Sequence, residues 1–181
     1  MSPALRGALL ALAAFGVYST HDVVVKTLGA HYSTFQIVFF VGLFSFPLIT
    51  LMLMQDKTDG NLIPRHPWWS AVRSLASLGA LVLGFFAFSQ LPMAQTYAIL
   101  FATPMLITLL SIPMLGEKVG LRRGLAVVVG MIGVLIVLRP GSAPLSLGHL
   151  AALGGALSGA ISSIIVRKIG SNERSVVLML Y

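Results

Sequence analysis

Long hydrophobic segments, separated by short polar connections, are the feature that most constrains what this chain can fold into. A helix needs about twenty mostly apolar residues to cross the hydrocarbon core of a bilayer. Segments close to that length cover residues 5–28, 35–54, 69–91, 94–115, 121–138 and 147–166, and another begins at Val176. Transmembrane β-strands would be about ten residues long with alternating polarity. The segments therefore predict an all-α, polytopic bundle of transmembrane helices.

The composition supports a bilayer as the solvent of this chain. Hydrophobic residues make up 57% of the 181 positions and charged residues only 9%, whereas soluble domains carry about 25% charged residues. So few charges cannot coat a globule in water, but hydrocarbon does not require them. We therefore expect membrane lipid to be the main partner of the surface.

The positive charges predict an orientation. The net charge of +7 could suggest nucleic-acid binding, but the bases stand between hydrophobic blocks instead of forming a stripe with aromatic residues. With a cytoplasmic N-terminus, only Lys26 and Arg139 fall outside. The bases then on the inside are Arg6, Lys57, Arg65, Arg73, Lys118, Arg122, Arg123, Arg167, Lys168 and Arg174. This bias predicts a multi-pass protein of the cell (inner or plasma) membrane with its N-terminus in the cytoplasm, and no nucleic-acid partner.

An internal repeat is visible when the sixth hydrophobic segment is aligned with the first at a shift of 141 residues. The alignment needs no gap, and its most specific part is the ending Val-Lys-x-Leu-Gly against Val-Arg-Lys-Ile-Gly, residues 25–29 and 166–170. Five spans in one unit would turn the next copy upside down, as in many secondary transporters. We expect a first five-helix repeat in residues 1–141 and the beginning of a second, inverted repeat in residues 147–181.

Several motifs resemble the EamA-type transporters of the drug/metabolite transporter superfamily. They are the first-span ending 21–29, the span containing Pro104 that closes in 116–118, and the small-residue segment 124–141. The first-span pattern is most similar to the branch that takes up S-adenosylmethionine or riboflavin. The resemblance implies ten helices in two inverted halves, a central cavity and secondary transport of a small metabolite.

Two departures from that family pattern affect the interpretation. Members of the branch often place an arginine shortly after the Phe-Phe pair of the second span, where this chain has Val41. The last four helices that the resemblance implies are also absent from these 181 residues. Either the sequence is a fragment, or the protein associates with a copy of itself or with a partner half to close a cavity.

The first span contains the strongest candidates for a substrate or ion pathway. Ionisable groups inside a bilayer are costly, so each is a functional candidate. Tyr18, Asp22 and Lys26 are spaced four residues apart and share one helical face, with His21 beside them. Asp22 or His21 could accept a proton or contact a cationic substrate. In the structural alternative, Asp22 and Lys26 neutralise each other and His21 bonds to a carbonyl.

The fourth span supplies the remaining candidates. Pro104 removes a backbone hydrogen bond and should bend this helix, which serves packing as often as gating. Tyr97 and Phe101 fall on one side of the helix and could form an aromatic wall of a cavity, although packing within the core explains them as well. In the sixth span, Gly155 and Gly159 belong to a ladder of small residues that predicts close helix packing.

Transport is the function that these features favour. The sequence lacks GxSxG, HExxH and a phosphate-binding glycine loop, and it has no cysteine, so an intramembrane enzyme is disfavoured. We expect no cofactor and no metal site. A non-transporting membrane assembly subunit or an inactive fragment is the alternative. The expected mechanism is alternating access, in which the two inverted repeats expose a central cavity to each side in turn.

Overall fold

The computed structural model describes residues 3–55, 62–138, 146–173 and 175–180, and its regular elements there are all helices. The prediction of an all-α bundle is confirmed. In chain order the helices are α1 (Pro3–Leu28), α2 (Thr34–Gln55), α3 (Pro67–Gln90), α4 (Met93–Leu100), α5 (Thr103–Leu115), α6 (Leu121–Leu138), α7 (Leu147–Ile169) and α8 (Ser175–Leu180).

Five spans in the described part are long and apolar enough to cross a membrane. They are Leu5–Leu28, Thr34–Met54, Pro67–Gln90, Met93–Leu115 and Leu147–Ile169. Helix α6, which we expected as the fifth span, is not among these five. It has 18 residues, and Arg122 and Arg123 occupy its first turn. Its apolar part is therefore shorter than the about twenty residues of a full crossing, and its crossing stays a prediction.

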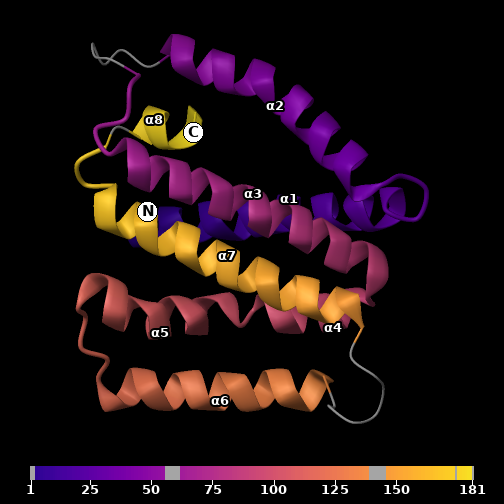
Figure 1. The fold of residues 1–181 in the computed structure, drawn as a ribbon, viewed down its shortest axis with the longest axis vertical. Coiled ribbons are helices and arrows are strands. Elements are labelled where there is room, and N and C mark those ends of the chain that lie inside the picture. The colour runs from indigo at the N-terminus through magenta and orange to yellow at the C-terminus, as the bar shows by residue number, and fades with distance from the viewer. Residues whose placement is uncertain (1–2, 56–61, 139–145, 174, 181) are drawn as a thin grey trace.

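Helices α3 and α7 lie side by side in the middle of the bundle (Figure 1) and make its most extensive contact. Helices α4 and α5 pack against α7, α1 packs against α3, and α6 lies on the outer side of α4 and α5. Helix α2 diverges from the bundle along part of its length (Figure 1), and α8 contacts α2. The molecule is thus built around the α3–α7 pair.

Small residues explain why α7 occupies this central place. Ala152, Ala156 and Ala160 are almost completely buried, and Gly155 faces α3 so closely that a Cβ there would lie 3.3 Å from the backbone nitrogen of Gly84. Small side chains let two helix backbones approach, which strengthens their van der Waals contact where lipid provides no hydrophobic drive between helices. The structure thus places the small-residue ladder at a close helix contact.

The fourth span is interrupted, as Pro104 predicts. It consists of α4 and α5, with a break at Phe101 and Ala102. Proline has no N–H to donate to the carbonyl four residues earlier, which here belongs to Leu100. The Thr103 hydroxyl donates to that carbonyl oxygen at 2.6 Å. The Leu100 carbonyl therefore keeps a hydrogen-bond donor despite the break in the helix.

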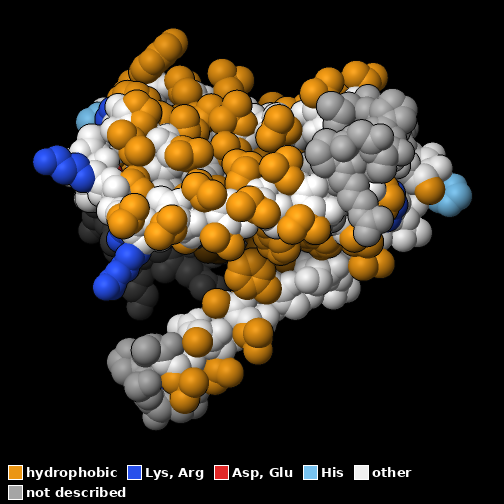
Figure 2. Space-filling model, turned by 90° about the horizontal axis from the view of Figure 1, so that it is seen from below, with side chains coloured by type: hydrophobic (Ala, Val, Ile, Leu, Met, Phe, Trp, Pro, Cys, Tyr) orange, Lys and Arg blue, Asp and Glu red, His pale blue; other side chains and the backbone are white. Residues whose placement is uncertain are grey.

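The outer surface fits a lipid environment. Figure 2 looks onto the face that α6 covers, and hydrophobic side chains spread over nearly all of it, while Lys and Arg side chains gather at the end where α6 begins. Large apolar residues on α1, α2 and α6 are widely exposed, including Phe15, Phe44 and Val129. A soluble monomer rarely exposes hydrophobic surface on this scale.

Candidate functional site

An open cavity of about 420 Å³ lies between α1, α3, α7 and the junction of α4 with α5. Its polar lining residues are Tyr18, His21, Asp22, Ser77, Thr103 and Ser162. The aromatic rings of Phe85 and Phe88 complete one wall. A cavity that combines aromatic walls with a few convergent polar groups is the usual form of a small-molecule site.

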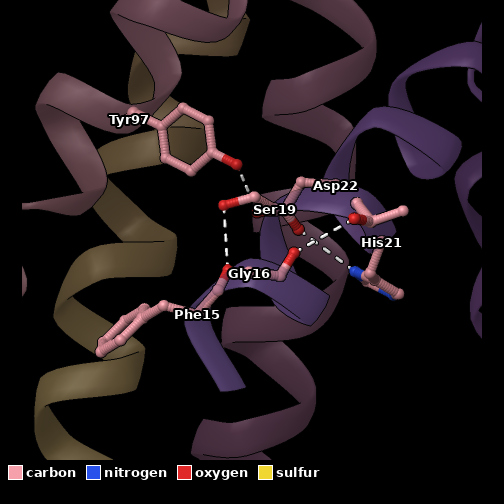
Figure 3. Close-up of polar contacts among 7 residues, drawn as sticks. Phe15, Gly16, Ser19, His21, Asp22 and Tyr97 are labelled. Atoms are coloured by element: carbon pink, nitrogen blue, oxygen red, sulfur yellow. Dashed lines mark hydrogen bonds and ion pairs between the residues drawn. The ribbon is translucent and has the colours of Figure 1, made fainter. Parts of the chain in front are cut away.

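Asp22 is the centre of the polar contacts at this cavity (Figure 3). Its Oδ2 accepts a hydrogen bond of 2.6 Å from the Tyr97 hydroxyl, which reaches α1 from α4. Its Oδ1 lies 3.1 Å from Nδ1 of His21. The Asp22 side chain is only 17% exposed. A carboxylate removed from water needs such donors, because an unpaired buried charge is strongly unfavourable.

Lys26 does not pair with Asp22, in contrast to the structural alternative considered above. Its Nζ donates instead to the carbonyl oxygens of Phe88 at 2.6 Å and Leu91 at 2.7 Å, at the C-terminal end of α3. The residue four after Phe88 is Pro92, which has no N–H to offer that carbonyl. A positive charge also suits the negative end of the helix dipole. Lys26 therefore binds the C-terminal end of α3 and does not line the cavity.

Of the other predicted site residues, the structure places some at the cavity and some away from it. Tyr18 lines the cavity, although it is 67% exposed. Phe101 stacks on Tyr97 with ring centroids 5.9 Å apart, outside the set of cavity-lining residues. Pro104 lies at a separate cavity between α5 and α6. The structure thus brings Tyr18, His21 and Asp22 together at the cavity, with Tyr97 bonded to Asp22 and Phe101 stacked behind Tyr97. Lys26 and Pro104 lie elsewhere.

Sequence reasoning missed the wall that α7 contributes. Gly159 and Ser162 line the same cavity as Tyr18 and His21, and the 141-residue shift of the predicted repeat pairs Gly159 with Tyr18 and Ser162 with His21. The signal was present in the alignment, but small and hydroxyl side chains carry no charge that would mark them as candidates.

A larger cavity of about 660 Å³ lies between α1 and α2, and we do not take it as the site. Its lining is mainly hydrophobic, with rings such as Phe40 and Phe44, and it includes no carboxylate. His21 lines both cavities. The smaller cavity is the better candidate because the carboxylate and the hydroxyl groups converge there. In the part of the chain that the structure describes, no cluster of three or more His, Cys, Asp and Glu could hold a metal ion.

Together, these features define a polytopic α-helical membrane protein with a polar, partly aromatic cavity between its helices. Its sequence is matched over residues 5–139 by the EamA-like transporter family. The chain belongs to this family, as its motifs suggested. No solved structure matches it.

The chain is similar to curated transporters of two kinds. The chain is 30% identical over 137 residues to a riboflavin transporter of Vibrio cholerae, covering 74% of this chain and 46% of that protein. It is 24% identical over 163 residues to S-adenosylmethionine uptake transporters of Rickettsia bellii and Rickettsia prowazekii, covering 90% of this chain and 56% and 55% of those proteins. The chain thus spans about half the length of the curated relatives it matches.

Proposed function

We propose that this protein acts in secondary transport, moving a small organic metabolite across the cytoplasmic membrane by alternating access between two inverted repeats. The observation that carries the proposal is the cavity between α1 and α7, which positions related by the repeat line from both sides. The complete carrier would need the remaining helices of the second repeat, from following sequence or from an associated chain.

The directions of the helices support an inverted repeat. The end of α1 and the start of α7 both lie at the C-terminal end of α3, because Lys26 bonds to Phe88 there and Gly148 packs against Leu91. The end of α7 lies at the start of α3, where Lys168 Nζ is 4.3 Å from the ring centroid of Trp69. Helices α1 and α7 therefore run in opposite directions (Figure 1), as one five-helix unit followed by an inverted copy requires.

The site suggests a planar aromatic metabolite as the substrate. Phe85, Phe88 and Tyr18 line the cavity together with a single carboxylate, Asp22. Riboflavin and S-adenosylmethionine, after which the relatives are named, both carry a planar heteroaromatic ring. A ring can stack against aromatic side chains, and a cationic group can additionally pair with Asp22. Both compounds are therefore suitable probes.

Uptake by an Asp22→Asn variant tests this function. We expect uptake of labelled riboflavin or S-adenosylmethionine into cells producing the protein to fall by about tenfold or more, because hydrogen bonds to charged groups contribute about 1.5–3 kcal/mol. Ser19→Ala is the matched control, since the Ser19 hydroxyl bonds to the Phe15 carbonyl of its own helix (Figure 3). Unchanged uptake by Asp22→Asn would remove this carboxylate from the mechanism.

Proton coupling through Asp22 or His21 is the finer part of the proposal. The two side chains are in contact and both line the cavity, so a proton could be exchanged where substrate binds. If Asp22 carries the coupling proton, the pH dependence of uptake disappears in Asp22→Asn and remains in Ser19→Ala. The same pH profile in both variants would show that Asp22 does not carry the coupling proton.

A further inference from the structure

The cavity contains a second polar feature, on the side of α3 and α7. The hydroxyl groups of Ser77 on α3 and Ser162 on α7 are 2.7 Å apart, and both residues line the cavity. They form a polar contact across the close α3–α7 interface. Nothing in the role proposed for Asp22 uses this contact.

The hydrogen bonding of this pair differs from that of other hydroxyls in the spanning helices. Hydroxyls such as those of Ser19, Thr27, Ser45, Thr50 and Ser163 donate to a carbonyl four residues earlier in their own helix. This satisfies the hydroxyl proton where no water is at hand. Ser77 and Ser162 bond to each other instead, so their hydroxyl groups are turned away from their own helices.

The pair keeps hydrogen-bonding capacity for a ligand. Two hydroxyls have two protons between them, and each oxygen can accept two hydrogen bonds. The Ser77–Ser162 bond uses one proton, and the other has no acceptor among the described residues. A donor without a partner is unfavourable once it is removed from water. The pair thus still has one hydroxyl proton to donate and oxygen lone pairs that can accept. A ligand group that both accepts and donates hydrogen bonds, such as an alcohol, matches this capacity.

We propose that Ser77 and Ser162 form a subsite that binds a hydroxyl group on the chain or sugar attached to the planar ring of the substrate. This inference rests on the proposed function, because it assigns part of the same cavity. Asp22 and the aromatic rings hold one part of the molecule, and the serine pair binds the hydroxylated part at the contact between α3 and α7. Neither residue is charged, so the subsite discriminates by hydrogen bonding alone.

Binding of riboflavin and lumichrome to the purified full-length chain in lipid nanodiscs tests the subsite. Lumichrome keeps the planar ring and lacks the hydroxylated chain, so it cannot use the serine pair. We expect Ser77→Ala and Ser162→Ala to weaken riboflavin binding by about three- to tenfold, the range that one net hydrogen bond provides. Lumichrome binding should stay unchanged in both variants.

Ser163→Ala is the matched control, because Ser163 neighbours Ser162 and its hydroxyl bonds to the Gly159 carbonyl within α7. It should bind both compounds as the unchanged chain does. The subsite is refuted if the two serine variants bind riboflavin normally, or if they lose riboflavin and lumichrome equally, as a general disturbance of the cavity would cause. If the unchanged chain binds neither compound, the proposed substrate class fails, and the subsite fails with it.

Discussion

At the scale of single residues, Lys26 shows how a charge inside a membrane-spanning helix is accommodated. Its ammonium group lies at the C-terminal end of α3, within hydrogen-bond distance of two carbonyl oxygens. Three donors on one flexible side chain can bond several carbonyls at once. Lys26 thereby satisfies the Phe88 carbonyl that Pro92 leaves without its usual partner, and it joins α1 to the turn between α3 and α4.

Replacing Lys26 by methionine should destabilise the protein. Methionine keeps the length of the side chain but leaves the Phe88 and Leu91 carbonyls without their donor, so we expect the free energy of unfolding to fall by about 1–3 kcal/mol. Lys26→Arg should retain most of the stability. Chemical unfolding of the purified protein in detergent micelles measures the difference. Lys118→Met is the control because Lys118 is exposed, and an equal loss there would contradict the role of Lys26.

At the scale of the helices, α3 is held at both ends by charges of suitable sign. Lys26 contacts its C-terminal carbonyls. At the other end, the carboxylate of Glu173, which is 8% exposed, accepts a hydrogen bond of 2.7 Å from the N–H of His66, the N-cap residue of α3. The positive charge of Lys26 lies at the negative end of the helix dipole and the carboxylate of Glu173 at its positive end, and both placements are favourable. They come from segments near the ends of α1 and α7, so α3 links the two helices that the predicted repeat would relate.

The spacing between α3 and α7 should depend on Gly155. A Cβ at this position would lie 3.3 Å from the Gly84 nitrogen and 3.5 Å from the Ala80 carbonyl oxygen, and backbone atoms cannot move aside as a flexible side chain can. We expect Gly155→Val to lower the free energy of unfolding by about 1–3 kcal/mol through overpacking. Its effect on unfolding in detergent should exceed that of Gly133→Val.

Gly133 in α6 is a matched control because nothing lies within 4 Å of a Cβ built there. Both substitutions place the same β-branched side chain in a helix, so the change in helix propensity cancels in the comparison. If the two variants unfold alike, close α3–α7 packing is not what Gly155 provides.

At the scale of the whole molecule, polar and charged contacts mark one end of the bundle. Arg167, at the end of α7, forms an ion pair with Glu117, which Gly116 places just beyond α5 by ending that helix in a left-handed conformation, with φ of 69°. Lys168 lies over Trp69 at the same end, near the start of α3. Lys26 lies at the opposite end of α3. This distribution agrees with a positive-inside orientation in which the Arg167 end faces the cytoplasm.

The proposed orientation and inversion can be tested together by cysteine labelling. The chain has no cysteine of its own, so Ala30→Cys and Ser171→Cys each introduce a single reactive thiol at an exposed position. We expect a membrane-impermeant maleimide to label Cys at position 30 in intact cells, and to label position 171 only after the membrane is permeabilised. Labelling of both positions from the same side would contradict the inverted repeat.

The sequence alone determined the solvent, the helical class and most of the spans, because these follow from local properties. About twenty apolar residues are long enough to cross a bilayer whatever their neighbours are, and Pro104 interrupts its helix by lacking an N–H. The same local reasoning found His21 and Asp22, since a charge inside an apolar segment is conspicuous. The crossing of the membrane by helix α6 remains a prediction of the same kind.

Only the tertiary structure decided which groups meet. Spacing along one helix offered Lys26 as a partner for Asp22, but the distances between helices gave Asp22 the hydroxyl of Tyr97 and gave Lys26 the carbonyls of α3. Ser77 and Ser162 are 85 residues apart, and each looks unremarkable in its own segment. Hydrogen bonds form between atoms about 3 Å apart, and such separations depend on how α1, α3 and α7 pack against one another.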